Sequence, residues 1–153
     1  MKQSTTLMLA GIALLGLAIP PSGFAQTNAV QPTGIFHLNV AKSKFPGAPL
    51  KSQIAYFDGQ KTAVAGIDAQ GTPRAAVFEV IEDGKPHPVT GFPAYDASTY
   101  TRVDAYTLTY TRTKDGKVVQ TGTAVTSPDG KTFTSTFTNT ANGQQTVQVY
   151  EKQ

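Results

Sequence analysis

The last third of the chain alternates between hydrophobic and polar residues in four successive runs. Short segments rich in Asp, Asn, Gly and Pro separate the runs. An Asp-Gly or Asn-Gly pair between alternating runs is the strongest short-range signal of a β-hairpin, because both residues tolerate the backbone angles of a tight turn. The pattern therefore predicts a meander of four antiparallel strands. The four strands are expected at residues 108–113, 118–127, 132–139 and 144–150.

Shorter alternating runs occupy the preceding part of the chain. They are expected to form strands at residues 34–38, 53–57, 62–67 and 74–81. Turn residues such as Asp58-Gly59 lie between them. No window of a dozen residues has the spacing of an amphipathic helix, so we expect at most a single helical turn, at residues 41–45. Residues 86–98 contain three prolines, which a central strand does not accommodate, and we expect an irregular loop there.

The strand pattern predicts an all-β fold, namely an antiparallel up-and-down β-barrel. Nine or ten short strands are expected, with tight Asp-Gly hairpins between sequence neighbours. Crossing connections of the Greek-key type would need longer links than the sequence provides. At 153 residues the chain is long enough for one core, and we place a single barrel domain at residues 34–153.

Loop lengths decide which side chains of a meander face the interior, because a one-residue change swaps the two faces. A two-residue turn at Asp115-Gly116 and a three-residue loop at residues 128–130 place the large apolar side chains on one face, with Val125 opposite Phe133. A loop of odd length at Asn142-Gly143 adds Val147 and Val149. The interior residues proposed as ligand-binding candidates are Leu108, Tyr110, Arg112, Thr121, Thr123, Phe133, Ser135 and Phe137.

Arg102 is a further candidate whose orientation depends on the loop that follows it. A three-residue loop at residues 104–106 turns Arg102 inward, whereas a two-residue turn at Asp104-Ala105 turns it outward. Polar groups on the predicted inner face are costly in a dry core unless they are hydrogen bonded. Either they satisfy one another and the backbone, or they line a wet cavity that takes a ligand. For Arg112 a third arrangement is a position at the rim with its head in solvent.

Residues 1–25 have the features of a secretory signal peptide. Lys2 supplies a positive charge, residues 7–19 are apolar or small, and Gly23-Phe24-Ala25 provides small residues for cleavage after Ala25. The alternative is a membrane anchor, but this apolar run is shorter than the ~18 residues that a spanning helix needs. We therefore expect a periplasmic or secreted bacterial protein without a stable membrane anchor after cleavage, and a flexible leader at residues 26–33.

The amino-acid composition argues against several classes of functional site. The absence of cysteine excludes disulfides, thiol nucleophiles and Cys-ligated metals. The two histidines, His37 and His87, lie far apart without zinc-site spacing, and the sequence suggests no metal, no cofactor and no catalytic residues. The net charge is only +3, with basic residues scattered along the chain, so we expect no nucleic-acid binding. We expect a monomer.

Five segments carry a resemblance to known proteins. They are GIFHLN at 34–39, KSKF at 42–45, DGKPHPVTG at 83–91, RVD at 102–104 and VYEK at 149–152. With them the chain resembles a family of small exported bacterial proteins without assigned function. Gly34 and Phe36 are also similar to the Gly-x-Trp signature on the first strand of lipocalins, with phenylalanine in place of tryptophan. The resemblance implies a lipocalin-like barrel and a small apolar ligand.

Three classes of function are compatible with the sequence. The first is an exported lipocalin-like binding protein for a small hydrophobic or amphipathic molecule, in which Arg112 or Arg102 meets an anionic head group. The second is an envelope structural or interaction protein with a filled barrel and no ligand. The third is a hydrolase or isomerase that uses isolated acidic residues, although most of these residues lie in or beside turns.

Overall fold

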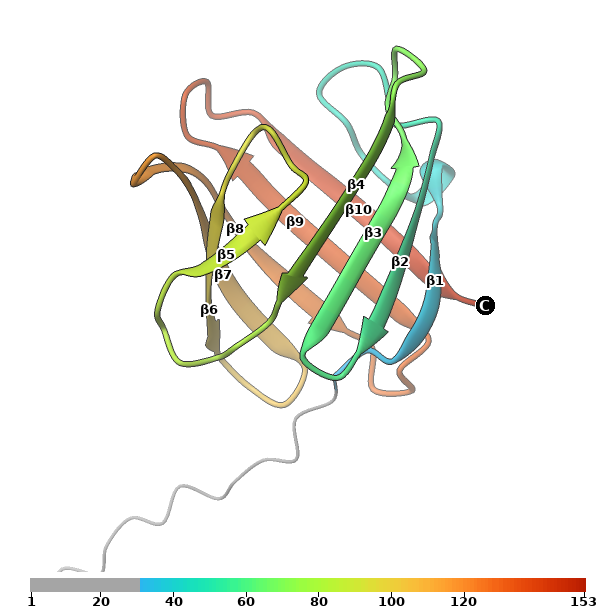
Figure 1. Cartoon of the computed structure of the whole chain (residues 1–153). Coiled ribbons are helices and arrows are strands. Elements are labelled where there is room, and N and C mark those ends of the chain that lie inside the picture. The colour runs from blue at the N-terminus through green and yellow to red at the C-terminus, as the bar shows by residue number, and fades with distance from the viewer. Residues whose placement is uncertain (1–30) are drawn as a thin grey trace, which may run out of the picture.

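The computed structural model describes residues 31–153, which form one closed β-barrel (Figure 1). Every strand pairs antiparallel with its sequence neighbours, and β1 closes the barrel against β10. The predicted up-and-down barrel is confirmed. The strands are β1 (Gly34–Leu38), β2 (Ser52–Asp58), β3 (Lys61–Ile67), β4 (Pro73–Glu79), β5 (His87–Thr90), β6 (Ala97–Arg102), β7 (Thr107–Lys114), β8 (Lys117–Thr126), β9 (Thr132–Asn139) and β10 (Gln145–Lys152).

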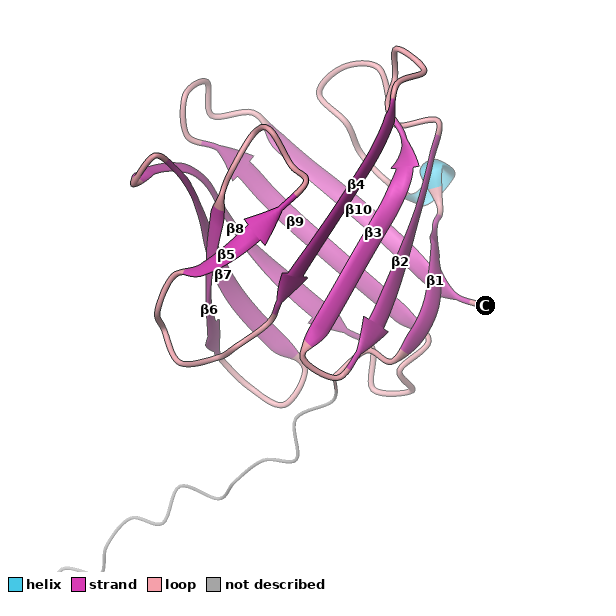
Figure 2. Cartoon of the chain, in the orientation of Figure 1, coloured by secondary structure: helices cyan, strands magenta, loops and turns pink. Residues whose placement is uncertain are grey.

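A short 3-10 helix, η1 (Val40–Lys42), follows β1 and begins one residue before the predicted helical turn (Figure 2). The Asn39 side chain caps it by accepting a hydrogen bond from the Lys42 N–H at 3.1 Å. No helix within residues 31–153 has the length and apolarity needed to cross a membrane. The predicted signal peptide and most of the predicted leader lie outside the described residues.

The segment at 86–98 departs from the predicted irregular loop, because it contains β5 and the start of β6. β5 pairs with each neighbour through two residue pairs only, and Pro88 lies opposite Ala97. So short a pairing needs few backbone donors, which is why a strand with a proline fits between β4 and β6. Residues 91–96 remain a loop between the two strands.

The β7–β8 hairpin has the predicted two-residue turn but not the predicted register along its whole length. Lys114 pairs with Lys117, and Asp115 and Gly116 adopt left-handed angles (φ +51° and +74°). A β-bulge then shifts the ladder, so that Arg112 lies opposite Gln120 and not opposite Val119. Because a bulge adds one residue to one strand, it exchanges the two faces of the rest of β8.

The two following loops also differ from the prediction. Thr126 pairs with Phe133, and Phe137 pairs with Thr146, so both loops have even length. The predicted pairing of Val125 with Phe133 is therefore wrong, and Val125 lies on the outer face with 39% exposure. The bulge in β8 and the longer loop between β8 and β9 have opposite effects on which face points inward. Phe133 therefore still shares the inner face with Leu108 and Tyr110. Val147 and Val149 do not join this face, since Gln148 and Tyr150 take their place.

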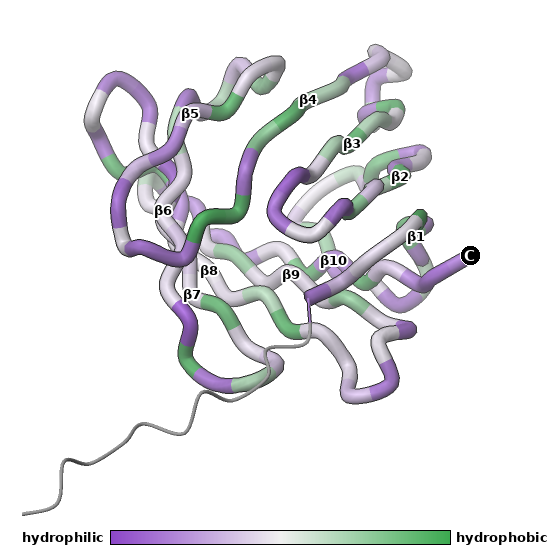
Figure 3. The backbone as a smooth tube through the Cα atoms, turned by 60° about the horizontal axis from the view of Figure 1, so that its bottom comes forward, coloured by the Kyte–Doolittle hydropathy of each residue, from purple (hydrophilic) through white to green (hydrophobic). Residues whose placement is uncertain are grey.

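The buried side chains form three clusters around the inside of the barrel. One cluster joins β1, β2 and β10 and contains Phe36, Ala55, Phe57 and Tyr150. The others are centred on Tyr110 and on Tyr95. Figure 3 shows the strands arranged around a common interior, with hydrophobic and hydrophilic positions alternating along them. The clusters cover the inner wall without filling the centre, as the cavity below shows.

Candidate ligand-binding cavity

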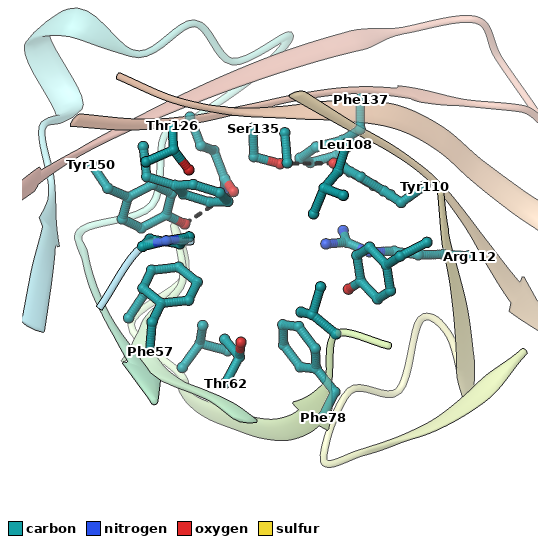
Figure 4. A pocket seen from close by; sticks show the side chains of 18 of the residues that line it. Phe57, Thr62, Phe78, Leu108, Tyr110, Arg112, Thr126, Ser135, Phe137 and Tyr150 are labelled. Atoms are coloured by element: carbon teal, nitrogen blue, oxygen red, sulfur yellow. Dashed lines mark hydrogen bonds between the residues drawn. The ribbon is translucent and has the colours of Figure 1, made fainter. Parts of the chain in front are cut away.

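The barrel encloses a cavity that extends between its two ends. The space open to the centre of a water molecule is about 140 Å³. One water needs only ~10–15 Å³ of such space, and an engineered protein cavity of ~150 Å³ holds benzene. Figure 4 shows side chains from many strands that point toward a central opening. The cavity is therefore large enough for a small organic molecule.

Aromatic and aliphatic side chains form most of the wall. The ring of Phe57 from β2 lies 4.9 Å from the ring of Phe133 on β9. Phe133 lies 6.0 Å from Tyr150 on β10, measured between ring centres. Phe78 from β4 and Leu108 from β7 line the opposite part of the cavity (Figure 4). Such rings give a large contact area for an apolar ligand.

Hydroxyl and amide groups interrupt this apolar wall at a few points. Tyr110 Oη and Ser135 Oγ are 2.7 Å apart and share a buried hydrogen bond. Tyr150 Oη accepts a hydrogen bond from Gln53 Nε2 at 2.9 Å. Gln53 Oε1 and the Thr62 hydroxyl are buried without a hydrogen-bond partner in the described part of the chain. Groups of this kind are suited to orient the polar atoms of a ligand or of bound water.

Gly122 on β8 makes room for one of these groups. It lies directly opposite Tyr110 on β7, and both face the interior. A Cβ atom at Gly122 would lie 2.7 Å from the Tyr110 ring and 2.8 Å from its hydroxyl oxygen. The missing side chain therefore lets the Tyr110 ring lie across β8 and reach Ser135 on β9.

Arg112 brings a positive charge into the cavity from the end of β7 (Figure 4). Its guanidinium carbon lies 4.5 Å from the centre of the Tyr95 ring and 4.7 Å from that of Tyr110. Its Nη1 donates a hydrogen bond to Gln120 Oε1 at 3.0 Å, and its Nε has no partner within residues 31–153. No carboxylate of these residues lies within 4.0 Å of it. The charge of Arg112 is thus not neutralised by an ion pair.

The neighbouring tyrosines do not supply a negative charge at neutral pH. Burial raises the pKa of Tyr95 and of Tyr150 above the ordinary value, and it raises the pKa of Tyr100 to about 12. These hydroxyl groups therefore stay protonated. Arg112 consequently remains a cation surrounded by neutral rings.

Arg102 lies at the other end of the cavity and has a different environment. Residues 104–106 form the three-residue loop that turns it inward, opposite Leu108. Its guanidinium binds the carboxylate of Glu82 through two nitrogens, with Nε to Oε2 at 2.8 Å. The Gln31 side chain donates to the same carboxylate. Because Glu82 neutralises it, Arg102 adds little net charge to the cavity.

The loop between β5 and β6 covers the end of the barrel where Arg112 lies. Phe92 and Tyr95 from this loop stack at 5.1 Å with an interplanar angle of 26°. The guanidinium carbon of Arg74 lies 4.8 Å from the centre of the Phe92 ring, and that of Arg112 lies 4.5 Å from the centre of the Tyr95 ring. The loop is thereby tied to β4 and β7 by cation–π contacts.

Most of the candidates predicted from the sequence line this cavity. The exceptions are Thr121 and Thr123, which the bulge in β8 turns to the exposed outer face. Gln120, Gly122 and Ala124 stand on the inner face of β8 in their place. The candidates that do line the cavity are Leu108, Tyr110, Arg112, Phe133, Ser135, Phe137 and Arg102.

Sequence reasoning missed the contribution of the first half of the chain. Phe57, Thr62 and Phe78 complete the wall from β2, β3 and β4. The alternation in β2 is regular, with every second residue buried, and it could have identified Phe57. The sequence predicts a strand at Tyr150 but an outward side chain, because it predicts a loop of odd length before that strand.

Groups for acid–base or metal chemistry are not gathered in the cavity. Its lining includes three arginines and no aspartate or glutamate. His87 donates a hydrogen bond to Asp83 at 2.9 Å, and this bond lowers the pKa of Asp83. His37 on β1 contacts the side chain of Gln153, the residue that follows β10. Residues 31–153 contain no group of three or more His, Asp or Glu side chains arranged to hold a metal ion.

Comparison with known proteins adds no further assignment. No protein-family model matches the sequence, and no curated protein is similar to it at a significant level. The cavity itself is therefore the basis for a functional inference.

Proposed function

We propose that this protein binds a small hydrophobic or amphipathic molecule inside its barrel, in the manner of a lipocalin. The observation that carries the proposal is the unfilled interior, about 140 Å³ in volume and lined by aromatic rings with a few convergent polar groups. A barrel that served only as a structural element would gain stability from a filled core, because each void forfeits packing contacts.

The expected signal peptide suggests where the protein works. Cleavage after Ala25 would release a periplasmic or secreted protein. A binding protein in that compartment would hold an apolar compound that dissolves poorly in water.

Titration with indole tests for a cavity that takes neutral aromatic molecules. We expect saturable binding of one indole per chain by isothermal titration calorimetry. Filling the cavity with Ala124→Phe should weaken this binding by at least roughly tenfold, since the new ring occupies the ligand space. Ala124 faces the interior and lines the cavity.

Thr123→Phe is the matched control for this experiment. Thr123 is the preceding residue of β8 and is exposed on the outer face. The control variant should bind indole like the wild type, and both variants should melt as folded proteins. Absence of indole binding to the wild type, or equal loss in the two variants, would contradict a binding cavity.

A second candidate function, contact with another protein, is favoured by one surface observation. Hydrophobic residues form a row across the outer face of β1 to β4, in which Ile35 pairs with Tyr56 and Ala63 pairs with Val77. Val77 is 59% exposed and Tyr56 is 48% exposed. Exposed apolar patches often mark interaction sites.

Self-association is the simplest contact that this face would support, because a second copy carries the same row. Sedimentation velocity over a hundredfold range of protein concentration measures it. We expect a monomer throughout this range. A dimer that Val77→Lys dissociates would favour the contact function instead.

A further inference from the structure

The charges around the cavity point to the chemical class of its ligand. We propose that the ligand is a small carboxylic acid, bound with its carboxylate on Arg112 and its apolar body along the aromatic wall. This inference rests on the proposed function and deepens it. Of the two arginines that the sequence offered for an anionic group, the structure favours Arg112.

Arg112 is the better anion site because its charge has no internal partner. Arg102 already binds the Glu82 carboxylate through two nitrogens. Arg112 has only the neutral amide oxygen of Gln120 and the faces of three aromatic rings. Arg112 is partly buried, so its cation loses part of its hydration without gaining a counterion, and an incoming carboxylate would offset that cost.

The geometry around Arg112 also favours a carboxylate. The rings of Tyr95, Tyr110 and Phe137 lie 4.5–5.7 Å from the guanidinium carbon and restrict its movement. In Figure 4 the guanidinium group points into the central opening. Because the guanidinium is planar and presents its donors in a fixed fork, it matches the two oxygens of a carboxylate.

The size and wall of the cavity define the rest of the ligand. A space of about 140 Å³ suits one ring or a short chain, and it is too small for a long-chain lipid without rearrangement. Phe57 and Tyr150 line the side of the cavity opposite Arg112 (Figure 4). An aromatic or short aliphatic body would lie there, with its charged group toward β7.

A purely structural role for Arg112 is the competing explanation. Its contact with Tyr95 helps to hold the β5–β6 loop over the barrel, and this contact needs no ligand. A structural arginine would affect stability, but it would not make the cavity prefer acids over neutral molecules of the same shape. The two roles therefore differ in ligand selectivity.

Cinnamate and cinnamamide are a matched pair of probes, because they differ mainly in the charge of one group. We expect the wild type to bind cinnamate roughly 10- to 100-fold more tightly at pH 7, which is the range for a hydrogen bond to a charged group. Arg112→Gln should reduce this ratio to less than about threefold and leave cinnamamide binding nearly unchanged. Arg112→Lys should keep part of the preference, since it retains the charge but not the fork.

Lys117→Gln is the control for a general loss of charge. Lys117 is exposed in the β7–β8 hairpin, at the same end of the barrel as Arg112. This substitution should leave the ratio of cinnamate to cinnamamide affinity unchanged. Cinnamamide binding shows that each variant is folded.

Equal affinity of the wild type for the two probes would overturn the acid proposal while leaving the binding function intact. A preference that survives in Arg112→Gln would overturn the role of Arg112, and binding of neither probe nor indole would reject the proposed function itself.

Discussion

Replacing Phe36 with alanine is expected to lower the free energy of unfolding by about 3–5 kcal/mol. Phe36 is completely buried and lies on β1, the strand that closes the barrel between β2 and β10. Its ring meets Phe57 edge-to-face at 5.4 Å and packs in the same cluster as Tyr150. The substitution removes this packing and leaves a cavity at the seam. Because domains of this size are stable by only ~5–15 kcal/mol, the loss should be readily measured by urea unfolding.

Ile35→Ala is the matched control for this measurement. Ile35 is the adjacent residue of β1, points to the outer face and is 43% exposed. The substitution should lower the free energy of unfolding by less than about 1 kcal/mol, as expected for a partly exposed side chain. If the two variants lost similar stability, the inner and outer faces of β1 would have to be reassigned.

The fold was predictable because local signals and topology agree in this chain. Tight turns such as Asp115-Gly116 connect strands that are neighbours in sequence, and in a meander these strands are also neighbours in space. The twist of ten consecutive strands curls the sheet, and this brings β1 and β10 together so that they close the barrel. The short strand β5 was missed, because its pairing is imposed by β4 and β6 and not by its own proline-containing sequence.

The inner face was harder to predict, since it depends on single residues inserted in strands and loops. The bulge next to Arg112 has no signature in the sequence, where Val118 and Val119 are both hydrophobic. Its effect is to move Thr121 and Thr123 outward and Gln120 inward. The even length of the next loop then restores Phe133 to the interior. Two errors of opposite effect therefore left the strongest apolar candidates in the correct place.

The electrostatic character of the cavity was also beyond the reach of the sequence. Arg102 and Arg112 are similar candidates in the sequence, since each precedes a predicted turn. Only the fold brings Glu82, twenty residues earlier, into contact with Arg102. Only the fold places Tyr95, from the β5–β6 loop, against Arg112. The difference between a neutralised arginine and an unneutralised one arises from these long-range contacts.

Introducing a methyl group at Gly122 is expected to destabilise the barrel by about 1–3 kcal/mol, the range for overpacking in a core. In Gly122→Ala the new Cβ atom would lie 2.4 Å from the carbonyl oxygen of Thr136 and 2.7 Å from the Tyr110 ring. The ring would have to move away from β8, and the Tyr110–Ser135 hydrogen bond would lengthen or break. Urea unfolding measures the loss of stability.

Gly47→Ala and Tyr110→Ala show whether the loss arises from this contact. No atom outside the neighbouring residues lies within 4 Å of a Cβ at Gly47, so that variant should change stability by less than about 0.5 kcal/mol. In a Tyr110→Ala background the added cost of Gly122→Ala should be smaller than in the wild type, because only the conflict with the Thr136 oxygen remains. Strict additivity of the two substitutions would mean that Tyr110 does not lie over Gly122. The hydrogen bond to Ser135 would then need another origin than the missing side chain of Gly122.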